Sequence, residues 1–362
     1  MLFLAHPLVN LIFPAAECHN SCRMRSQDLR ITAVRPSLGV PGGVVEIQCC
    51  GFRPGLPGQS RVVLGPAEAR IVTASEERVI SRLPNSPAAL GIALDVHGKT
   101  SPLYPFVLAT RLAAGLHPVT SPAIAPDGSV ITTISGSRGQ QVQQPLVKVN
   151  QAGEKIPFSC EIMNPTGLAF SPDGQLYISS RHDGTVLRYT DYEDLEVFAD
   201  DLGIATGLAF DSKGFLYVGD RAGKIYCIDP LGVKKEHASL EPSVSAYHLA
   251  MDSSDRLYVT GPTLSMRDVL YRIPAQGQVE IVLSGLARPQ GMAFLSSGDL
   301  LIAASHGGKK GIFRYSPRTG ELAHFIAGPT LIGLAVRDGE IIIADGNSIF
   351  GLRPEPGVAP VV

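Results

Sequence analysis

The stretch Pro165-Thr166-Gly167-Leu168-Ala169-Phe170-Ser171-Pro172-Asp173-Gly174-Gln175-Leu176-Tyr177 reads as a strand, a tight turn and a second strand. Its apolar run Leu168-Ala169-Phe170 suits a buried strand, and Asp173-Gly174 supplies the positive-φ residues of a two-residue hairpin turn. A single hairpin cannot shield its own apolar face from water, so the fold requires further copies of the motif.

The motif recurs along the chain. Near copies begin at Thr206, Tyr247, Gln290 and Ile332, and a looser copy begins at Thr120. Measured at the position of Gly167, the spacings are 46, 40, 41, 43 and 42 residues. This period, with several strands per repeat, is typical of a β-propeller. We predict an all-β fold with a six-bladed propeller over 110–357 and a tail over 358–362.

Composition agrees with an all-β protein that has many turns. Charged residues make up 18% of the chain, and there are 38 glycines and 28 prolines in 362 residues. The net charge of −2 provides no field that would attract nucleic acid or an anionic membrane. No apolar run has the length of a membrane span. We therefore expect neither a nucleic-acid partner nor a membrane span.

The six cysteines give no zinc pattern. Cys18 and Cys22 flank His19 without a second ligand pair at a defined spacing, which favours two thiols in a leader over a metal site or a disulfide. Cys49 and Cys50 are neighbours, so on a strand they point to opposite faces and one is expected in the core. Cys160 and Cys227 read as small buried hydrophobes.

Residues 1–28 form a leader with two interpretations. Leu2 to Ala16 is mostly apolar, but no Lys or Arg precedes it, and His6, Pro7 and Asn10 interrupt it. A defective or misplaced export signal is one interpretation, and a disordered leader is the other. We lean to export, which would place the protein in the periplasm or outside the cell.

Short alternating strands fill residues 29–109 and predict a small sandwich. The segments Gly39-Val40-Pro41-Gly42-Gly43, Val45-Glu46-Ile47 and Gly51-Phe52, with Asp95-Val96-His97-Gly98 later, resemble an IPT/TIG domain, which has an immunoglobulin-like fold. This resemblance implies a spacer or interaction module.

The last repeat lacks a fourth strand. It runs through Ser348-Ile349-Phe350-Gly351-Leu352 and ends in Pro354-Glu355-Pro356-Gly357. We predict that a segment near 107–116 supplies the missing strand and joins the start of the propeller to its end. This closure would tie the sandwich to the rim between the first and last blades.

The repeats resemble two families, the NHL-repeat proteins and the senescence-marker-protein/gluconolactonase family, which share a six-bladed propeller. Pro165-Thr166-Gly167-Leu168-Ala169-Phe170 and Leu216-Tyr217-Val218-Gly219-Asp220 carry the likeness. In the lactonase family the resemblance implies a divalent cation, usually calcium, held by a Glu, an Asn and an Asp. The corresponding positions here hold Thr120, Thr166 or Thr206, and Gln290. We therefore predict no metal and no cofactor, with calcium only if a lactonase site has been rearranged.

Candidate ligand-binding residues come from two sets of positions expected at one mouth of the propeller. The first set holds the residues that enter each innermost strand, and the second holds those in the loop between the second and third strands. The candidates are Thr120, Thr166, Thr206, Tyr247, His248 and Gln290 from the first set, and His182, Asp183, Asp220, Arg221, His306, Asp345 and Asn347 from the second.

For two kinds of candidate residue, a structural role is the alternative to ligand binding or catalysis. Asp220 and Asp345 follow equivalent strands, where a carboxylate can accept backbone N–H bonds in its own turn, and we favour that role for the aspartates. His248 replaces the glycine of the other copies, so its ring must project into the channel or displace a neighbour. We regard it as the candidate catalytic residue, with structural and functional roles equally weighted.

The function we predict is that of a metal-free, non-catalytic module that binds a small molecule or a protein at the propeller mouth, with the Ig-like domain as spacer. The alternative is a lactonohydrolase with a rearranged metal site, and a surface structural repeat protein is a further alternative. No G-x-S-x-G elbow, phosphate loop, dinucleotide fingerprint or H-E-x-x-H motif points to another enzyme class.

Overall fold

The computed structural model describes residues 28–55, 58–87, 89–134, 142–158, 161–190, 194–265, 267–275 and 277–354. Residues 1–27 of the predicted leader, the C-terminal tail, Cys18, Cys22 and Cys160 lie outside these ranges. Every regular element of the described chain is a β-strand, so the all-β prediction is confirmed. No helix in this part of the chain has the length and hydrophobicity of a membrane span.

The N-terminal strands form a seven-stranded sheet of order β1-β3-β6-β5-β4-β7-β8. β5 pairs with β4 through Ala67–Ala69 and with β6 through Arg70–Ala74, so the sheet turns at this strand. Val45 and Ile47 share one core with Val62 and Leu94 from the other end of the sheet. The strands are β1 (Arg30–Arg35), β3 (Val44–Cys50), β4 (Ser60–Leu64), β5 (Ala67–Ala74), β6 (Arg78–Arg82), β7 (Ala93–Val96) and β8 (Lys99–Thr100).

Cys49, Cys50 and Cys227 lie among the residues that the structure describes. Cys49 is buried in this core, where burial raises the pKa of its thiol to about 12. Cys50 takes part in a disulfide. Cys227 is a free cysteine buried within a propeller blade, as its apolar surroundings in the sequence predicted.

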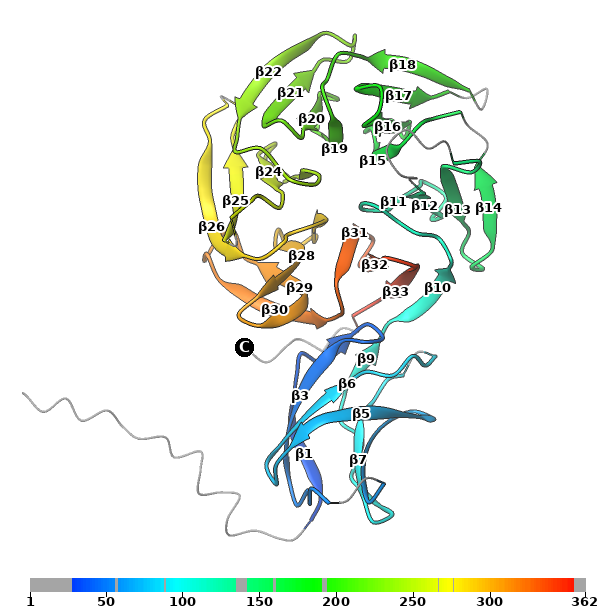
Figure 1. Cartoon of the computed structure of the whole chain (residues 1–362), viewed down its shortest axis with the longest axis vertical. Coiled ribbons are helices and arrows are strands. Elements are labelled where there is room, and N and C mark those ends of the chain that lie inside the picture. The colour runs from blue at the N-terminus through cyan, green and yellow to red at the C-terminus, as the bar shows by residue number, and fades with distance from the viewer. Residues whose placement is uncertain are drawn as a thin grey trace, which may run out of the picture.

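The propeller sheets are arranged around a central opening (Figure 1). Four of them are consecutive four-stranded units of antiparallel neighbours. Their strands are β11 (Ala123–Ile124), β12 (Val130–Thr133), β13 (Leu146–Val149), β14 (Lys155–Phe158), β15 (Pro165–Phe170), β16 (Leu176–Ser180), β17 (Thr185–Tyr189), β18 (Leu195–Ala199), β19 (Ala205–Phe210), β20 (Leu216–Asp220), β21 (Lys224–Ile228), β22 (Lys234–Ser239), β23 (His248–Met251), β24 (Leu257–Thr260), β25 (Asp268–Ile273) and β26 (Glu280–Leu286).

A fifth four-stranded sheet closes the ring. β31 (Leu331–Arg337), β32 (Glu340–Asp345) and β33 (Ser348–Leu352) come from the last repeat, and β10 (Thr110–Ala114) pairs antiparallel with β33. The prediction that a segment near 107–116 supplies the missing strand is therefore confirmed. The closing strand contributes Ala113 to a core that it shares with the first repeat. Leu116, which follows this strand, is buried in the same core.

The remaining sheet has six strands, so five four-stranded sheets are found where the repeat predicted six. β27 (Met292–Phe294), β28 (Leu300–His306), β29 (Lys309–Tyr315) and β30 (Leu322–Ala327) are continued by β2 (Leu38–Gly39) and β9 (Val107–Leu108) of the N-terminal region. β2 lies parallel to β30, and the N–H of Val40 donates to the carbonyl of Ala327 at 2.8 Å. The N-terminal unit is thus joined to the penultimate repeat as well as to the closing sheet, because its own edge residues pair with β30.

Candidate functional site

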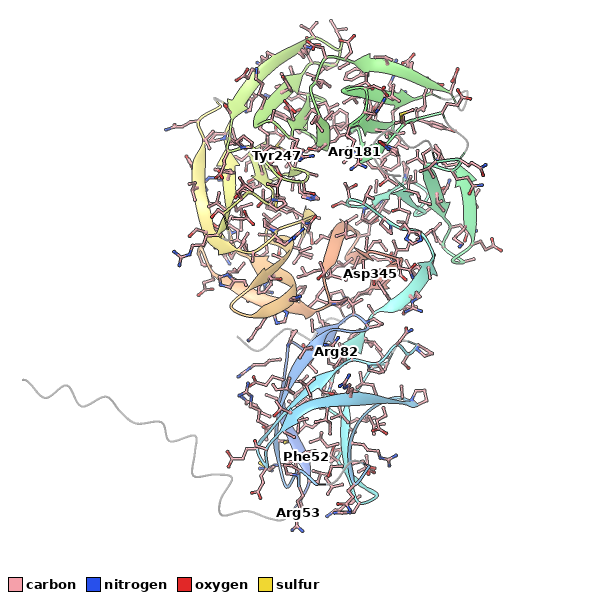
Figure 2. The ribbon with its side chains drawn as sticks, in the orientation of Figure 1. Phe52, Arg53, Arg82, Arg181, Tyr247 and Asp345 are labelled. Atoms are coloured by element: carbon pink, nitrogen blue, oxygen red, sulfur yellow. The ribbon has the colours of Figure 1, made fainter. Side chains whose placement is uncertain are left out.

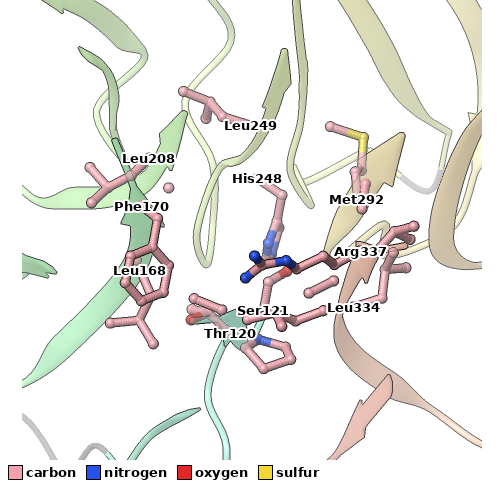
Figure 3. Close-up of a pocket in the computed structure, with 18 of the residues that line it drawn as sticks. Thr120, Ser121, Leu168, Phe170, Leu208, His248, Leu249, Met292, Leu334 and Arg337 are labelled. Atoms are coloured by element: carbon pink, nitrogen blue, oxygen red, sulfur yellow. The ribbon is translucent and has the colours of Figure 1, made fainter. Parts of the chain in front are cut away.

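A cavity of about 670 Å³ lies among the innermost strands of the propeller (Figure 3). The strands β11, β15, β19, β23, β27 and β31 each contribute residues to its wall. Most of the residues that line it are apolar, with Leu168, Phe170, Leu208, Leu249, Met292 and Leu334 among their side chains.

Glycines bring the innermost strands close together. A Cβ on Gly207 would collide with the backbone carbonyl of Tyr247 in the next repeat, and one on Gly333 would collide with the Cα of Ser121. A Cβ on Gly291 would lie 2.6 Å from the Cα of Gly333. The repeated glycine of the sequence motif therefore sets the spacing between neighbouring innermost strands, which no larger residue would allow.

His248 stands where the fourth repeat lacks this glycine. It begins β23, is 5% exposed and lines the cavity. Figure 3 shows its imidazole directed toward the middle of the cavity. The ring therefore projects into the channel, which was one of the two outcomes expected for a bulky residue at this position.

The environment of His248 keeps its ring neutral. Burial lowers the pKa of His248 to about 4, while hydrogen bonding to the Gln290 side chain acts in the opposite direction. Its Nε2 atom is buried and has no hydrogen-bond partner among the described residues. A neutral imidazole nitrogen can donate or accept according to its tautomer, so Nε2 is an unsatisfied buried polar atom beside the cavity.

Other polar groups in the wall are few. Thr120 donates its hydroxyl to the carbonyl of Thr166, while Ser121 lies next to it in the lining. Arg337, the last residue of β31, directs its guanidinium toward the middle of the cavity in Figure 3. It donates to the carbonyl of Ala125 and lies 3.6 Å from the carboxylate of Asp338. Arg337 is the cationic residue of the lining, and Asp173 is its carboxylate.

Three of the predicted site residues line this cavity, namely Thr120, Tyr247 and His248. The other entry positions lie behind the wall. Thr166 and Thr206 are buried and donate to the carbonyls of Asn164 and Gly219, and the Thr206 hydroxyl also accepts from the Tyr247 N–H. Gln290 does not line the cavity, and its side chain hydrogen-bonds to that of His248. The Tyr247 hydroxyl donates to the carbonyl of Glu241 rather than to the cavity.

The loop positions do not line the cavity, and their aspartates have structural contacts. Asp220 accepts from the N–H groups of Ile204 and Ala222. Asp345 accepts from the N–H groups of Asn347 and Ser348 at 2.8 and 2.7 Å. These bonds confirm the structural contacts expected for carboxylates that follow equivalent strands.

The remaining loop candidates also bond locally. Asp183 lies 3.9 Å from His182 and accepts from Ser180. Arg221 donates to the carbonyl of Ser243, and His306 contacts the carbonyl of Gly285 through Nδ1 at 3.0 Å. Figure 2 places Tyr247 and Arg181 toward the inside of the ring. Binding by the loop candidates stays a prediction.

The residues at the expected calcium positions do not fit a hard cation. Thr120, Thr166 and Thr206 are neutral, and each hydroxyl already donates to a backbone carbonyl. Within the described ranges, no group of three or more His, Cys, Asp or Glu side chains could hold a metal ion. Since calcium needs several oxygen ligands, some of them anionic, this donor set does not match the lactonase family.

Sequence reasoning missed Arg337 and the apolar lining. Arg337 comes at the far end of an innermost strand, whereas the prediction considered only strand entries and one set of loops. One signal was present: the last repeat reads Leu334-Ala335-Val336-Arg337, whereas earlier repeats place Ser171 or Asp211 after the strand's phenylalanine.

Comparison with known proteins supports the fold. No protein-family model and no curated protein matches the sequence. An auxiliary nutrient binding protein from Bacteroides ovatus superposes with a TM-score of 0.53 at 13% identity, covering 91% of this chain and 98% of that one. A structure provisionally named a gluconolactonase gives 0.55 at 16% identity, covering 68% and 91%. The PQQ-bound aldose sugar dehydrogenase of Streptomyces coelicolor gives 0.53 at 19%, covering 67% and 96%.

The extent of these matches differs between the neighbours. The nutrient binding protein matches nearly the whole chain, whereas the other two match about two thirds of it. At these identities the likeness concerns the fold alone. The structural neighbours are β-propeller proteins with binding and enzymatic roles, and this chain shares their propeller fold.

Proposed function

We propose that this protein is a binding module that holds a small organic ligand in the central cavity of its propeller. We count β27–β30 as a sixth blade, and we assign the N-terminal unit to the IPT/TIG class of immunoglobulin-like domains as a spacer. The observation that carries the proposal is the cavity of about 670 Å³ among the innermost strands, which His248 and Arg337 line together with apolar side chains.

The lining indicates the chemistry of the ligand. Aliphatic and aromatic side chains favour an apolar skeleton, and His248 favours one hydroxyl or carbonyl group at the level of β23. Arg337 favours a carboxylate or another electron-rich group at the other end of the innermost strands. A small hydroxylated or lactone-like molecule with an apolar face meets these conditions. The nutrient-binding role named for one neighbour supports the class of function.

A lactonohydrolase is the second candidate, supported by the gluconolactonase-like neighbour. A hydrolase needs a group that activates water. His248 is the titratable residue that could serve. Its imidazole is neutral near neutral pH, but a pKa of about 4 makes it a weak general base. The neutral hydroxyls at the expected calcium positions argue against the family's own metal site.

The test is a thermal-shift and calorimetric screen with sugars, sugar lactones, hydroxy acids and small aromatic carboxylates. We expect a ligand from this panel to bind the wild type and to lose about tenfold or more in affinity in His248→Phe and in Arg337→Ala. Arg318→Ala, at an exposed position between β29 and β30 and outside the cavity lining, is the control and should bind normally. A hit whose affinity is the same in all three variants would place its site elsewhere and overturn the proposal.

The same proteins are assayed for lactone and ester hydrolysis with and without a chelator. Turnover that is lost in His248→Phe would establish the hydrolase. Turnover that the chelator also removes would establish a rearranged metal site. Binding without turnover supports the binding module.

A further inference from the structure

A second cavity, of about 570 Å³, lies between the N-terminal unit and the propeller. One wall is the outer face of the β1-β3-β6 part of the N-terminal sheet. The other wall is the β28–β29 turn with β30 and the segment that follows it. Figure 2 places Arg82 at the end of the N-terminal unit that faces the propeller, and Phe52 and Arg53 at its far end. We call this cavity the interdomain groove.

Strand alternation directs arginines into the groove. Arg35 is the register partner of Glu46, and Glu46 is the partner of Ile80. Because side chains alternate along a strand, Arg78 and Arg82 lie on the same face as Ile80. All three arginines line the groove, and Lys309 and Lys310 line it from the propeller side.

The charge of the groove is strongly unbalanced. Its lining holds five cationic side chains, which are Arg35, Arg78, Arg82, Lys309 and Lys310, and one carboxylate, that of Glu46. Arg78 pairs with Glu46 at 2.9 Å. The four other cations form no ion pair with any described residue. The whole chain carries a net charge of −2, so this positive charge is local and not a general property of the protein.

One cross-strand pair places like charges together. Arg82 is the register partner of Arg70 in the antiparallel pairing of β6 with β5. Like charges directly opposite each other across two strands are destabilising. Arg70 itself lies outside the lining of the groove, and an anion held beside Arg82 would offset this repulsion.

The two walls are held at a fixed separation. Gly39 pairs with Ala327, and the Val40 N–H donates to the carbonyl of Ala327. Pro329 and Thr330, just after this junction, belong to the lining of the groove. This junction therefore fixes the backbone of the two walls from which the cationic side chains extend.

We propose that the interdomain groove binds an oxoanion group, a phosphate or sulfate ester carried by a small ligand. Arginine presents its N–H donors in a planar fork that matches such oxygens, and lysine adds charge. The volume suits a ligand about the size of one or two sugar units. This site is separate from the central cavity and does not depend on the function proposed for that cavity.

The test is isothermal titration of the full chain with inorganic pyrophosphate, a compact multivalent oxoanion. We expect binding that weakens as salt rises, because the groups are exposed and screened. Arg82→Ala and Lys310→Ala, one from each wall, should each raise Kd by about tenfold or more. Arg53→Ala removes an exposed arginine at the far end of the same unit and should leave Kd unchanged. Arg82→Lys keeps the charge and should lose less than Arg82→Ala.

A parallel titration with sodium sulfate distinguishes the two oxoanion sources by their relative affinities. His248→Phe reports on the central cavity and should bind pyrophosphate normally, so failure of one site can be told from failure of the other. Circular dichroism confirms that each variant is folded. The proposal is overturned if neither anion binds, if Arg53→Ala weakens binding as much as Arg82→Ala, or if a polyglutamate peptide binds the groove while both inorganic anions do not.

Discussion

Thr110 is the register partner of Gly351, so the strand that leaves the N-terminal unit pairs with the last strand of the propeller. This pairing makes the first and last repeats depend on each other. Leu116 is fully buried in the core that β10 shares with Val130 and Ile349 of those repeats.

Leu116→Ala should destabilise the closed ring. Removing a fully buried leucine leaves a cavity and costs about 2–5 kcal/mol. Urea unfolding monitored by tyrosine fluorescence gives the change in midpoint. Leu103→Ala, at a side chain that is 72% exposed, is the control and should shift the midpoint little. Equal midpoints for Leu116→Ala and the wild type would mean that closure does not hold the ring together.

Gly43→Ala should loosen the docking of the N-terminal unit. A Cβ at Gly43 would lie 2.6 Å from the backbone carbon of Ala327, and backbone cannot yield as a flexible side chain would. We expect a lower Tm and a larger radius of gyration in solution scattering. Gly346→Ala, whose Cβ would meet only an ordinary contact at 4.0 Å, is the matched control. A variant as compact and as stable as the wild type would show that the junction tolerates displacement.

Gly207→Ala should disturb the innermost strands themselves. The added methyl group meets the carbonyl of Tyr247, so β19 and β23 must separate, at a cost of about 1–3 kcal/mol. Because Tyr247 and His248 are adjacent, ligand binding in the central cavity should weaken as well. Thermal denaturation measures the first effect and the cavity titration the second. A stable variant with normal binding would contradict the spacing role of the glycines.

His248 should make stability depend on pH in mildly acid solution. Its pKa is about 4 in the folded chain, compared with the ordinary value of 6.5, so between these values the unfolded chain binds more protons. Folding stability from this residue is therefore complete above about pH 6.5 and is lost as pH falls toward 4. Urea midpoints between these pH values should fall less steeply in His248→Gln than in the wild type.

His182→Gln is the matched control, because His182 is partly exposed in its turn. Its midpoints should follow those of the wild type across the same range. An imidazole NMR titration of the wild type gives the pKa of His248 directly. A midpoint of titration near 6.5 would contradict the buried, neutral ring.

Much of the architecture could be predicted because it depends on local patterns. Asp173-Gly174 and its equivalents specify hairpins, and their spacing specifies repeated antiparallel sheets. The last repeat ends after Leu352 with three strands, and an unpaired edge must be covered, so the pairing of β10 followed from counting strands. The aspartates after equivalent strands were assigned to their turns for the same local reason.

The sequence by itself determined the all-β repeats, the closing strand and the unusual position of His248. Only the tertiary structure decided that β2 and β9 extend the sheet of β27–β30, that Arg337 shares a cavity with His248, and that Arg82 faces Lys309 and Lys310 across a groove. The physical reason is the range of the interactions. Turns and strand alternation are set by neighbouring residues, whereas the meeting of two walls depends on backbone pairing between distant segments, which no short pattern encodes.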